Sequence, residues 1–74
     1  MNEFDLGLFS RRLQIVLEYR TESKQYAPWA EEHGFAQNTM SQWLRGKNPP
    51  SVPALFKLCK ELDVSADFLL GLEE

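Results

Sequence analysis

Five side chains that carry amide or hydroxyl groups fall within six consecutive residues of this 74-residue chain: Gln37, Asn38, Thr39, Ser41 and Gln42. The amide of Gln or Asn holds a hydrogen-bond donor and an acceptor side by side, the pattern that matches the major-groove edge of adenine. A hydroxyl can bond to a base or to a phosphate. A helix face that serves solubility alone more often carries Glu and Lys. The cluster therefore indicates contact with double-stranded DNA.

The cluster is predicted to lie on a short helix, residues 37–45. Met40, Trp43 and Leu44 recur at three- and four-residue spacing and are expected to face the core, which turns the polar side chains outwards. Gly46 ends this helix, because glycine adopts the left-handed backbone that follows many helices at no steric cost.

A second short helix is predicted just before the cluster. It begins at Gln25 or Tyr26, because Pro28 is tolerated only in a first helical turn, and it ends near His33. Gly34 then turns the chain within three or four residues. Two short helices joined in this way have the length and spacing of a helix-turn-helix, although the arrangement alone also fits ordinary packing in a helical bundle.

Three more helices complete the expected fold. The helix over residues 6–19 has the apolar stripe Phe9, Leu13, Val16 and Leu17. The fourth helix follows the N-cap Ser51 and has the stripe Val52, Leu55, Phe56, Cys59 and Leu62. The fifth is capped by Ser65. The same spacing assigns the larger aromatic residues to the core rather than to an exposed stacking platform: Trp29, Phe35, Trp43, Phe56 and Phe68. No alternating pattern is long enough for a strand, so we expect an all-α, compact five-helix fold in one domain, residues 1–74 with a core of about 9–71.

The charge of the chain is acidic in total but not around the polar cluster. The chain has 8 Lys and Arg against 11 Asp and Glu, a net charge of −3, whereas DNA-binding domains are usually basic. The stretch from His33 to Lys60 contains no acid, and its basic residues are Arg45, Lys47, Lys57 and Lys60. This stretch supplies the local positive charge that phosphate contacts need.

Other classes of function find little support. A chain of 74 residues has no room for a deep substrate cavity beside its core, and no catalytic triad or glycine-rich phosphate loop occurs, so we expect no enzyme, cofactor or small-molecule substrate. Cys59 and His33 are each the only residue of their type, so we expect a packed thiol, a partly packed imidazole and no metal site. The acidic start and the lack of a long apolar run argue against a signal peptide or membrane contact and predict a cytoplasmic protein.

The stretch from Gly34 to Ser51, GFAQNTMSQWLRGKNPPS, resembles the helix-turn-helix signature of the Cro/C1-type regulators, the phage repressor and XRE-like family. Matches at Arg12 and over residues 55–71 extend the likeness to about residues 9–71. The resemblance implies a lambda-repressor-like domain that places its third helix in the major groove of a palindromic operator. It further implies a homodimer that regulates transcription in a bacterium or a phage-infected host, with repression as the expected outcome.

The resemblance also assigns roles to single residues. Base contacts fall to Gln37, Asn38, Ser41 and Gln42. Contacts to the DNA backbone fall to Gln25 or Tyr26, Thr39, Arg45, Lys47, Asn48 and Ser51, the last at a helix N-terminus that offers backbone N–H groups. Two roles are open for Arg45, which either reaches a phosphate or interacts with the carbonyl groups at the end of its own helix.

Several positions depart from the family pattern. Tyr26 replaces the Gln that usually opens the second helix and contacts phosphate, so either its hydroxyl or Gln25 takes that contact. Trp29 replaces a smaller Leu, and we expect a rearranged entry to the second helix. Leu44 stands where an acid often pairs with the arginine of the first helix, which leaves Arg12 open to a phosphate or to another carboxylate.

Two kinds of partner remain open at this stage. One is a double-stranded DNA operator. The other is a basic protein bound by a module of the same fold, an antitoxin or anti-regulator, whose acidic ends would face its partner. The acid-free polar helix favours DNA. A dimer contact is expected from an exposed apolar patch among Phe4, Leu6, Leu8, Leu70 and Leu72.

Overall fold

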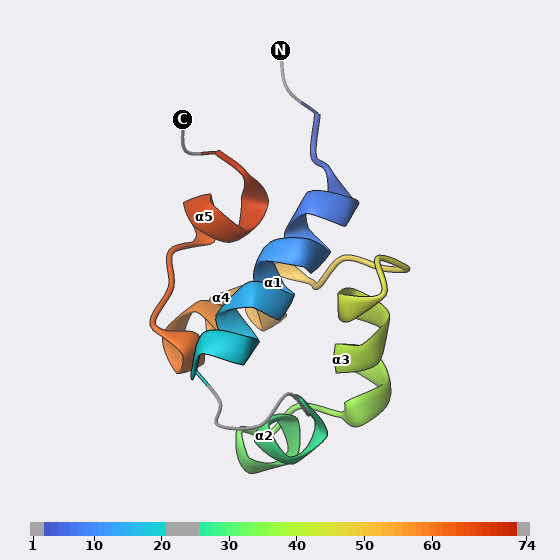
Figure 1. The fold of residues 1–74 in the computed structure, drawn as a ribbon, viewed down its shortest axis with the longest axis vertical. Coiled ribbons are helices and arrows are strands. Elements are labelled where there is room, and N and C mark those ends of the chain that lie inside the picture. The colour runs from blue at the N-terminus through green and yellow to red at the C-terminus, as the bar shows by residue number, and fades with distance from the viewer. Residues whose placement is uncertain (1–2, 21–25, 73–74) are drawn as a thin grey trace.

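The fold consists of five α-helices in the described part of the chain, residues 3–20 and 26–72 of a computed structural model (Figure 1). They are α1 (Leu6–Arg20), α2 (Tyr26–Glu32), α3 (Gln37–Leu44), α4 (Val52–Leu62) and α5 (Ala66–Leu70), and no strand occurs among these residues. The predicted all-α, five-helix fold is confirmed. Gln25 lies outside the described residues, and α3 ends at Leu44, with Arg45 as its C-cap.

Side chains at the helix starts satisfy backbone N–H groups that have no partner within the helix. Asp5 Oδ1 accepts from the Leu8 N–H at 3.1 Å, so α1 begins where the acid stands. Ser51 Oγ accepts from the Ala54 N–H at 3.3 Å, and Ser65 Oγ accepts from the Phe68 N–H at 3.1 Å. Both predicted serine caps are confirmed.

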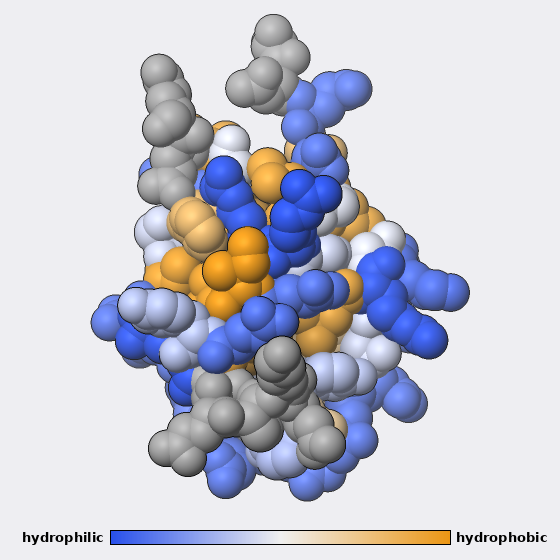
Figure 2. Space-filling model, viewed as in Figure 1, coloured by the Kyte–Doolittle hydropathy of each residue, from blue (hydrophilic) through white to orange (hydrophobic). Residues whose placement is uncertain are grey.

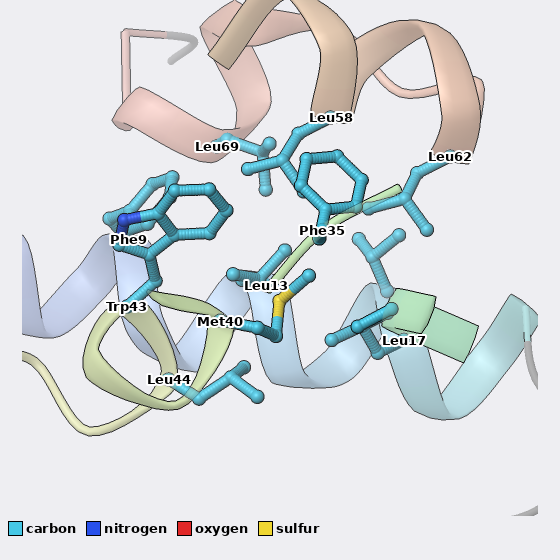
Figure 3. Close-up of a cluster of buried hydrophobic side chains, with 12 residues drawn as sticks. Phe9, Leu13, Leu17, Phe35, Met40, Trp43, Leu44, Leu58, Leu62 and Leu69 are labelled. Atoms are coloured by element: carbon cyan, nitrogen blue, oxygen red, sulfur yellow. The ribbon is translucent and has the colours of Figure 1, made fainter. Parts of the chain in front are cut away.

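One core joins all five helices (Figure 3). Figure 3 shows Leu13 and Met40 in its middle, with Leu58, Leu62 and Leu69 facing them from α4 and α5. Helix α1 is central, because it packs against α3, α4 and α5, whereas α2 packs against α3. In Figure 1, α3 therefore lies on one side of α1 and α5 on the other.

The predicted apolar stripe of α4 is wrong at two positions. Val52 and Phe56 are 79% and 64% exposed, while Leu58 and Leu62 are fully buried. At about 100° per residue, a core centred between Leu58 and Leu62 places Phe56 about 140° and Val52 about 100° from the buried direction. The expected stripe omitted Leu58, and this error rotated the whole inward face towards Phe56.

The remaining aromatic assignments fit the structure. Phe35 and Trp43 are buried, and their rings meet edge to face at 5.9 Å between centroids. Trp29 is half-buried, and its ring stacks on that of Phe35 at 5.7 Å between centroids. Trp29 and Phe68 both pack against the core. The stacked rings of Trp29 and Phe35 attach α2 to the start of α3.

Figure 2, in the view of Figure 1, shows apolar side chains over the middle of α1 and hydrophilic side chains around them. Ile15 contributes to the exposed apolar surface and lines a shallow hollow with Val64 and Phe68. None of the described helices is long and apolar enough to span a bilayer.

Candidate nucleic-acid interface

The outward side of α3 carries the polar residues that the sequence singled out. Met40 and Trp43 face the core, so the opposite side of the helix presents Asn38, Gln42 and Arg45, which follow each other at four- and three-residue spacing and are all exposed. Gln37 and Thr39 are also exposed, whereas Ser41 is half-buried. We call the exposed polar residues of α3 and its C-cap the crest, and the half-buried Ser41 lies on its flank. The residues of the crest are Gln37, Asn38, Thr39, Gln42 and Arg45.

The first residue of the crest is held by the preceding helix. Gln37 Nε2 donates to Glu31 Oε1, a carboxylate oxygen on the last turn of α2. Both side chains are exposed. Because a carboxylate only accepts hydrogen bonds, this contact fixes which end of the Gln37 amide faces α2.

A shallow hollow borders one flank of the crest, and several predicted contact residues line it together. Asn48 Nδ2 donates to Gln42 Oε1 at 2.9 Å across this hollow. The other polar side chains that line it come from three segments of the chain: Thr39, Ser51 and Lys57. The structure thus brings Gln42, which the sequence assigned to base contact, together with three residues that it assigned to the DNA backbone, Thr39, Asn48 and Ser51, and with Lys57.

A second hollow borders the opposite flank. Tyr26, the first residue of α2, lines it together with Ser41 and Arg45 of the α3 region and with Gln14 and Glu18 of α1. Tyr26 is half-buried and Arg45 is exposed. Tyr26 therefore lies on the same side of α3 as Arg45.

Two residues of α1 that the sequence did not single out hold the end of α3. Ser10 Oγ donates to the Trp43 carbonyl at 2.5 Å, and Gln14 Nε2 donates to the Leu44 carbonyl at 2.9 Å. Ser10 is buried, at 6% exposure. The Trp43 carbonyl also accepts from the Gly46 N–H at 3.3 Å, and the two side-chain bonds fix the orientation of the end of α3 relative to α1.

Lys57 is a further residue that the sequence placed only in the basic stretch. Its Nζ donates to the Gly34 carbonyl at 3.2 Å and lies 4.8 Å from the centre of the Phe35 ring. The ammonium group therefore binds the turn between α2 and α3. Lys60, by contrast, lies over the exposed Phe56 ring at 5.5 Å, away from the crest on α4.

The start of α4 offers fewer backbone donors than the sequence suggested. The Ala54 N–H donates to Ser51 Oγ, the Leu55 N–H donates to the Ser51 carbonyl, and Pro53 has no N–H. Among the first residues of α4, the Val52 N–H is the donor left for a phosphate. Lys47 and Asn48 are exposed in the loop just before it.

Arg12 is engaged by α5. Its Nη1 donates to the Phe68 carbonyl at 2.6 Å, and its guanidinium lies 4.6 Å from the centre of the Phe68 ring. The sequence suggested a phosphate or a carboxylate as the partner of Arg12. It did not predict this hydrogen bond and ring contact, which join α1 to α5.

The single histidine and cysteine have structural contacts. His33 Nδ1 is 2.5 Å from Glu61 Oε1, and the imidazole stacks on Trp29 at 4.3 Å. Cys59 is half-buried against the core, and burial raises the pKa of its thiol above the ordinary value. Among the described residues no group of three or more His, Cys, Asp or Glu side chains lies close enough to hold a metal ion.

The model of a helix-turn-helix family, the Cro/C1 or XRE type, matches residues 30–69, more than half of the chain. The chain belongs to this family. Its members are DNA-binding transcription regulators rather than a family of enzymes. No curated protein and no solved structure matches the chain.

The family match covers the crest and its surroundings in this Cro/C1-type domain. It begins at Ala30, in the middle of α2, and runs through α3, α4 and most of α5. The beginning of α2, with Tyr26, Pro28 and Trp29, lies outside the matched residues. Tyr26 and Trp29 are two of the positions named above as departures from the family pattern, and the third, Leu44, lies within the matched residues.

Proposed function

We propose that this Cro/C1-type domain is a sequence-specific repressor that places α3 in the major groove of a palindromic DNA operator. The observation that carries the proposal is the acid-free crest of amide and hydroxyl side chains on α3. One hollow beside it gathers further polar groups and Lys57, and the hollow on the other side holds Tyr26 and Arg45 together with the carboxylate of Glu18. An α-helix fits the major groove, where amides distinguish base edges.

The proposal divides the site into two sets of contacts. Bases are contacted by Gln37, Asn38, Ser41 and Gln42. The DNA backbone is contacted by Tyr26 or Gln25, Thr39, Arg45, Lys47, Asn48 and Ser51. Asn38 and Gln42 are supported by their central place on the crest, and Arg45 and Lys47 by their exposure next to its end. Lys57 joins the second set, because it lines the hollow that holds Thr39 and Ser51.

Selection of bound sequences from random DNA tests this function, followed by titrations with the selected operator and with random DNA. Asn38→Ala is expected to cost about 1–3 kcal/mol on the operator and little on random DNA. Lys47→Ala is expected to weaken binding to both and to lower the salt slope by about one. Equal losses for Asn38→Ala on both DNAs would remove Asn38 from base contact. A failure to enrich any sequence at low salt would favour a basic protein as the partner instead.

The dimer is proposed to form through the apolar patch near the two ends of the described chain. Phe4 and Leu72 are 49% and 65% exposed and line one shallow hollow with Leu70 and Gly71. Two half-sites about one helical turn apart need two copies of α3 related by a twofold axis. Leu72→Glu should weaken self-association in sedimentation equilibrium, whereas Phe56→Glu on α4 should not. Unchanged association of the Leu72 variant would exclude this patch.

A further inference from the structure

The hydrogen bonds made by the two glutamines of α3, Gln37 and Gln42, differ in direction. Gln37 donates through Nε2 to Glu31, whereas Gln42 accepts through Oε1 from Asn48 at 2.9 Å. In both cases the partner lies outside α3, on α2 or in the loop after α3. Each partner takes up one hydrogen-bonding group of a glutamine amide, and the groups that remain are available to DNA.

The contact with Glu31 leaves Gln37 with a particular set of groups. A glutamine amide has two N–H donors and one carbonyl acceptor, and Glu31 takes one of the donors. One donor and the acceptor remain. Adenine presents one acceptor, N7, and one donor, the N6 amino group, whereas guanine presents two acceptors, N7 and O6. The remaining groups of Gln37 therefore complement adenine and not guanine.

The contact with Asn48 leaves Gln42 with the opposite set. Its carbonyl oxygen is engaged by Asn48, so both N–H donors remain for the groove. These donors complement edges that only accept, namely O6 and N7 of guanine or O4 of thymine. The two glutamines, identical in sequence, thus differ in the bases that they match.

We propose that Glu31 and Asn48 are positioning residues that set the base preference of Gln37 and Gln42 without contacting the bases. This inference rests on the proposed DNA contact of α3 and adds to it which base each glutamine selects. The position of Glu31 supports it. A carboxylate beside a DNA-binding helix repels phosphate and lowers affinity for every DNA, so its presence there is accounted for by the orientation that it gives Gln37.

Glu31→Gln is the sharpest test of the first contact, because glutamine keeps the size of the side chain but can donate as well as accept. At the base that faces Gln37, the unaltered protein should prefer adenine over guanine by at least about fivefold. In Glu31→Gln that preference should fall to about twofold or less. Glu32→Gln is the matched control: it removes the same charge from the next exposed residue of α2, and Gln37 does not contact Glu32. Both variants should bind random DNA more tightly by similar factors.

Asn48→Asp tests the second contact by reversing it. Aspartate only accepts, so Gln42 should turn its N–H groups towards residue 48 and present its carbonyl oxygen to the groove. Preference at that base should move from guanine or thymine to adenine or cytosine, whose edges include a donor. Lys47→Gln makes an equal change in charge in the same loop. It should weaken binding to every DNA, because Lys47 is assigned to the DNA backbone, and should not shift which base is preferred opposite Gln42. Asn48→Ala, which releases Gln42, should flatten the preference.

Selection from random DNA with each purified variant, at one salt concentration, gives these preferences directly. Circular dichroism confirms that each variant is folded, and all four substituted side chains are exposed. A preference that stays as steep in Glu31→Gln as in the unaltered protein, or that does not move in Asn48→Asp, overturns the inference while the proposed function stands. If the unaltered protein enriches no sequence, the proposed function fails and the inference with it.

Discussion

Replacement of Gly34 by alanine should destabilise the turn between α2 and α3 for two separable reasons. Gly34 has a φ of +79°, and a residue with a Cβ in the left-handed region costs roughly 1–2 kcal/mol. A Cβ at this position would also lie 2.7 Å from Lys57 Nζ, so the ammonium group must move away. That movement breaks its bond to the Gly34 carbonyl, an exposed contact of about 0.5–1.5 kcal/mol. We expect a total loss of about 1.5–3.5 kcal/mol.

Gly46→Ala is the matched control for the backbone cost. Gly46 has a φ of +72°, and its Cβ would make only an ordinary contact, 3.4 Å from Ser10 Oγ. It should therefore lose about 1–2 kcal/mol. In a domain of this size each kcal/mol lowers the midpoint of thermal unfolding by roughly 4–8 °C. The lost Lys57 contact costs Gly34→Ala about 1 kcal/mol more than Gly46→Ala, so its midpoint should lie about 4–8 °C lower.

Thermal unfolding of both glycine variants, with and without Lys57→Ala, separates the two costs. In the Lys57→Ala background the difference between the variants should vanish, because the side chain that obstructs Gly34 is absent. Equal losses for Gly34→Ala and Gly46→Ala in the unaltered background would refute the role given to Lys57. A difference that persists without Lys57 would refute it as well.

Three further predictions concern the core. Met40→Ala should lose about 2–5 kcal/mol in urea unfolding, whereas Phe56→Ser should change stability by no more than about 0.5 kcal/mol, since only Met40 is buried. Ser10→Ala should lose about 1 kcal/mol in the same assay, because the Trp43 carbonyl loses a buried donor. Burial raises the pKa of the Cys59 thiol in the folded state, so the thiol should react more slowly with a disulfide reagent near pH 8 in buffer than in urea. The unfolded chain releases this proton more readily, so the stability that Cys59 contributes should decline as pH rises through its ordinary value of 9.0.

Features that depend on neighbours in sequence were predictable. The apolar spacing of α1 predicted its buried residues Phe9, Leu13, Val16 and Leu17, and the serine caps predicted where α4 and α5 begin. The outward direction of the α3 crest followed from the inward direction of Met40 and Trp43. The error at Phe56 arose because α4 is apolar on more than half of its circumference, so periodicity alone did not decide which part faces the core.

Contacts between distant residues were not predictable in this way. Ser10 and Trp43 are 33 residues apart, and nothing in the local pattern of α1 shows that a serine there would hold the end of α3. Arg12 and Phe68 are 56 residues apart. Glu31 is a different case. It is six residues from Gln37, yet its carboxylate entered the prediction only through the net charge of the chain.

A net charge of −3 is compatible with a DNA-binding crest because the crest itself carries no acid. The acids elsewhere in the chain lower the attraction of the whole molecule to DNA of any sequence. Glu31 lies beside the crest and has the same cost, but its hydrogen bond limits the groups that Gln37 can offer to a base. The repulsion by the acids lowers binding to random DNA and to a matched site alike, whereas the orientation of Gln37 acts only where a base is matched. We therefore expect this domain to have a smaller salt slope than a basic relative, and a larger part of its affinity to come from the bases that α3 contacts.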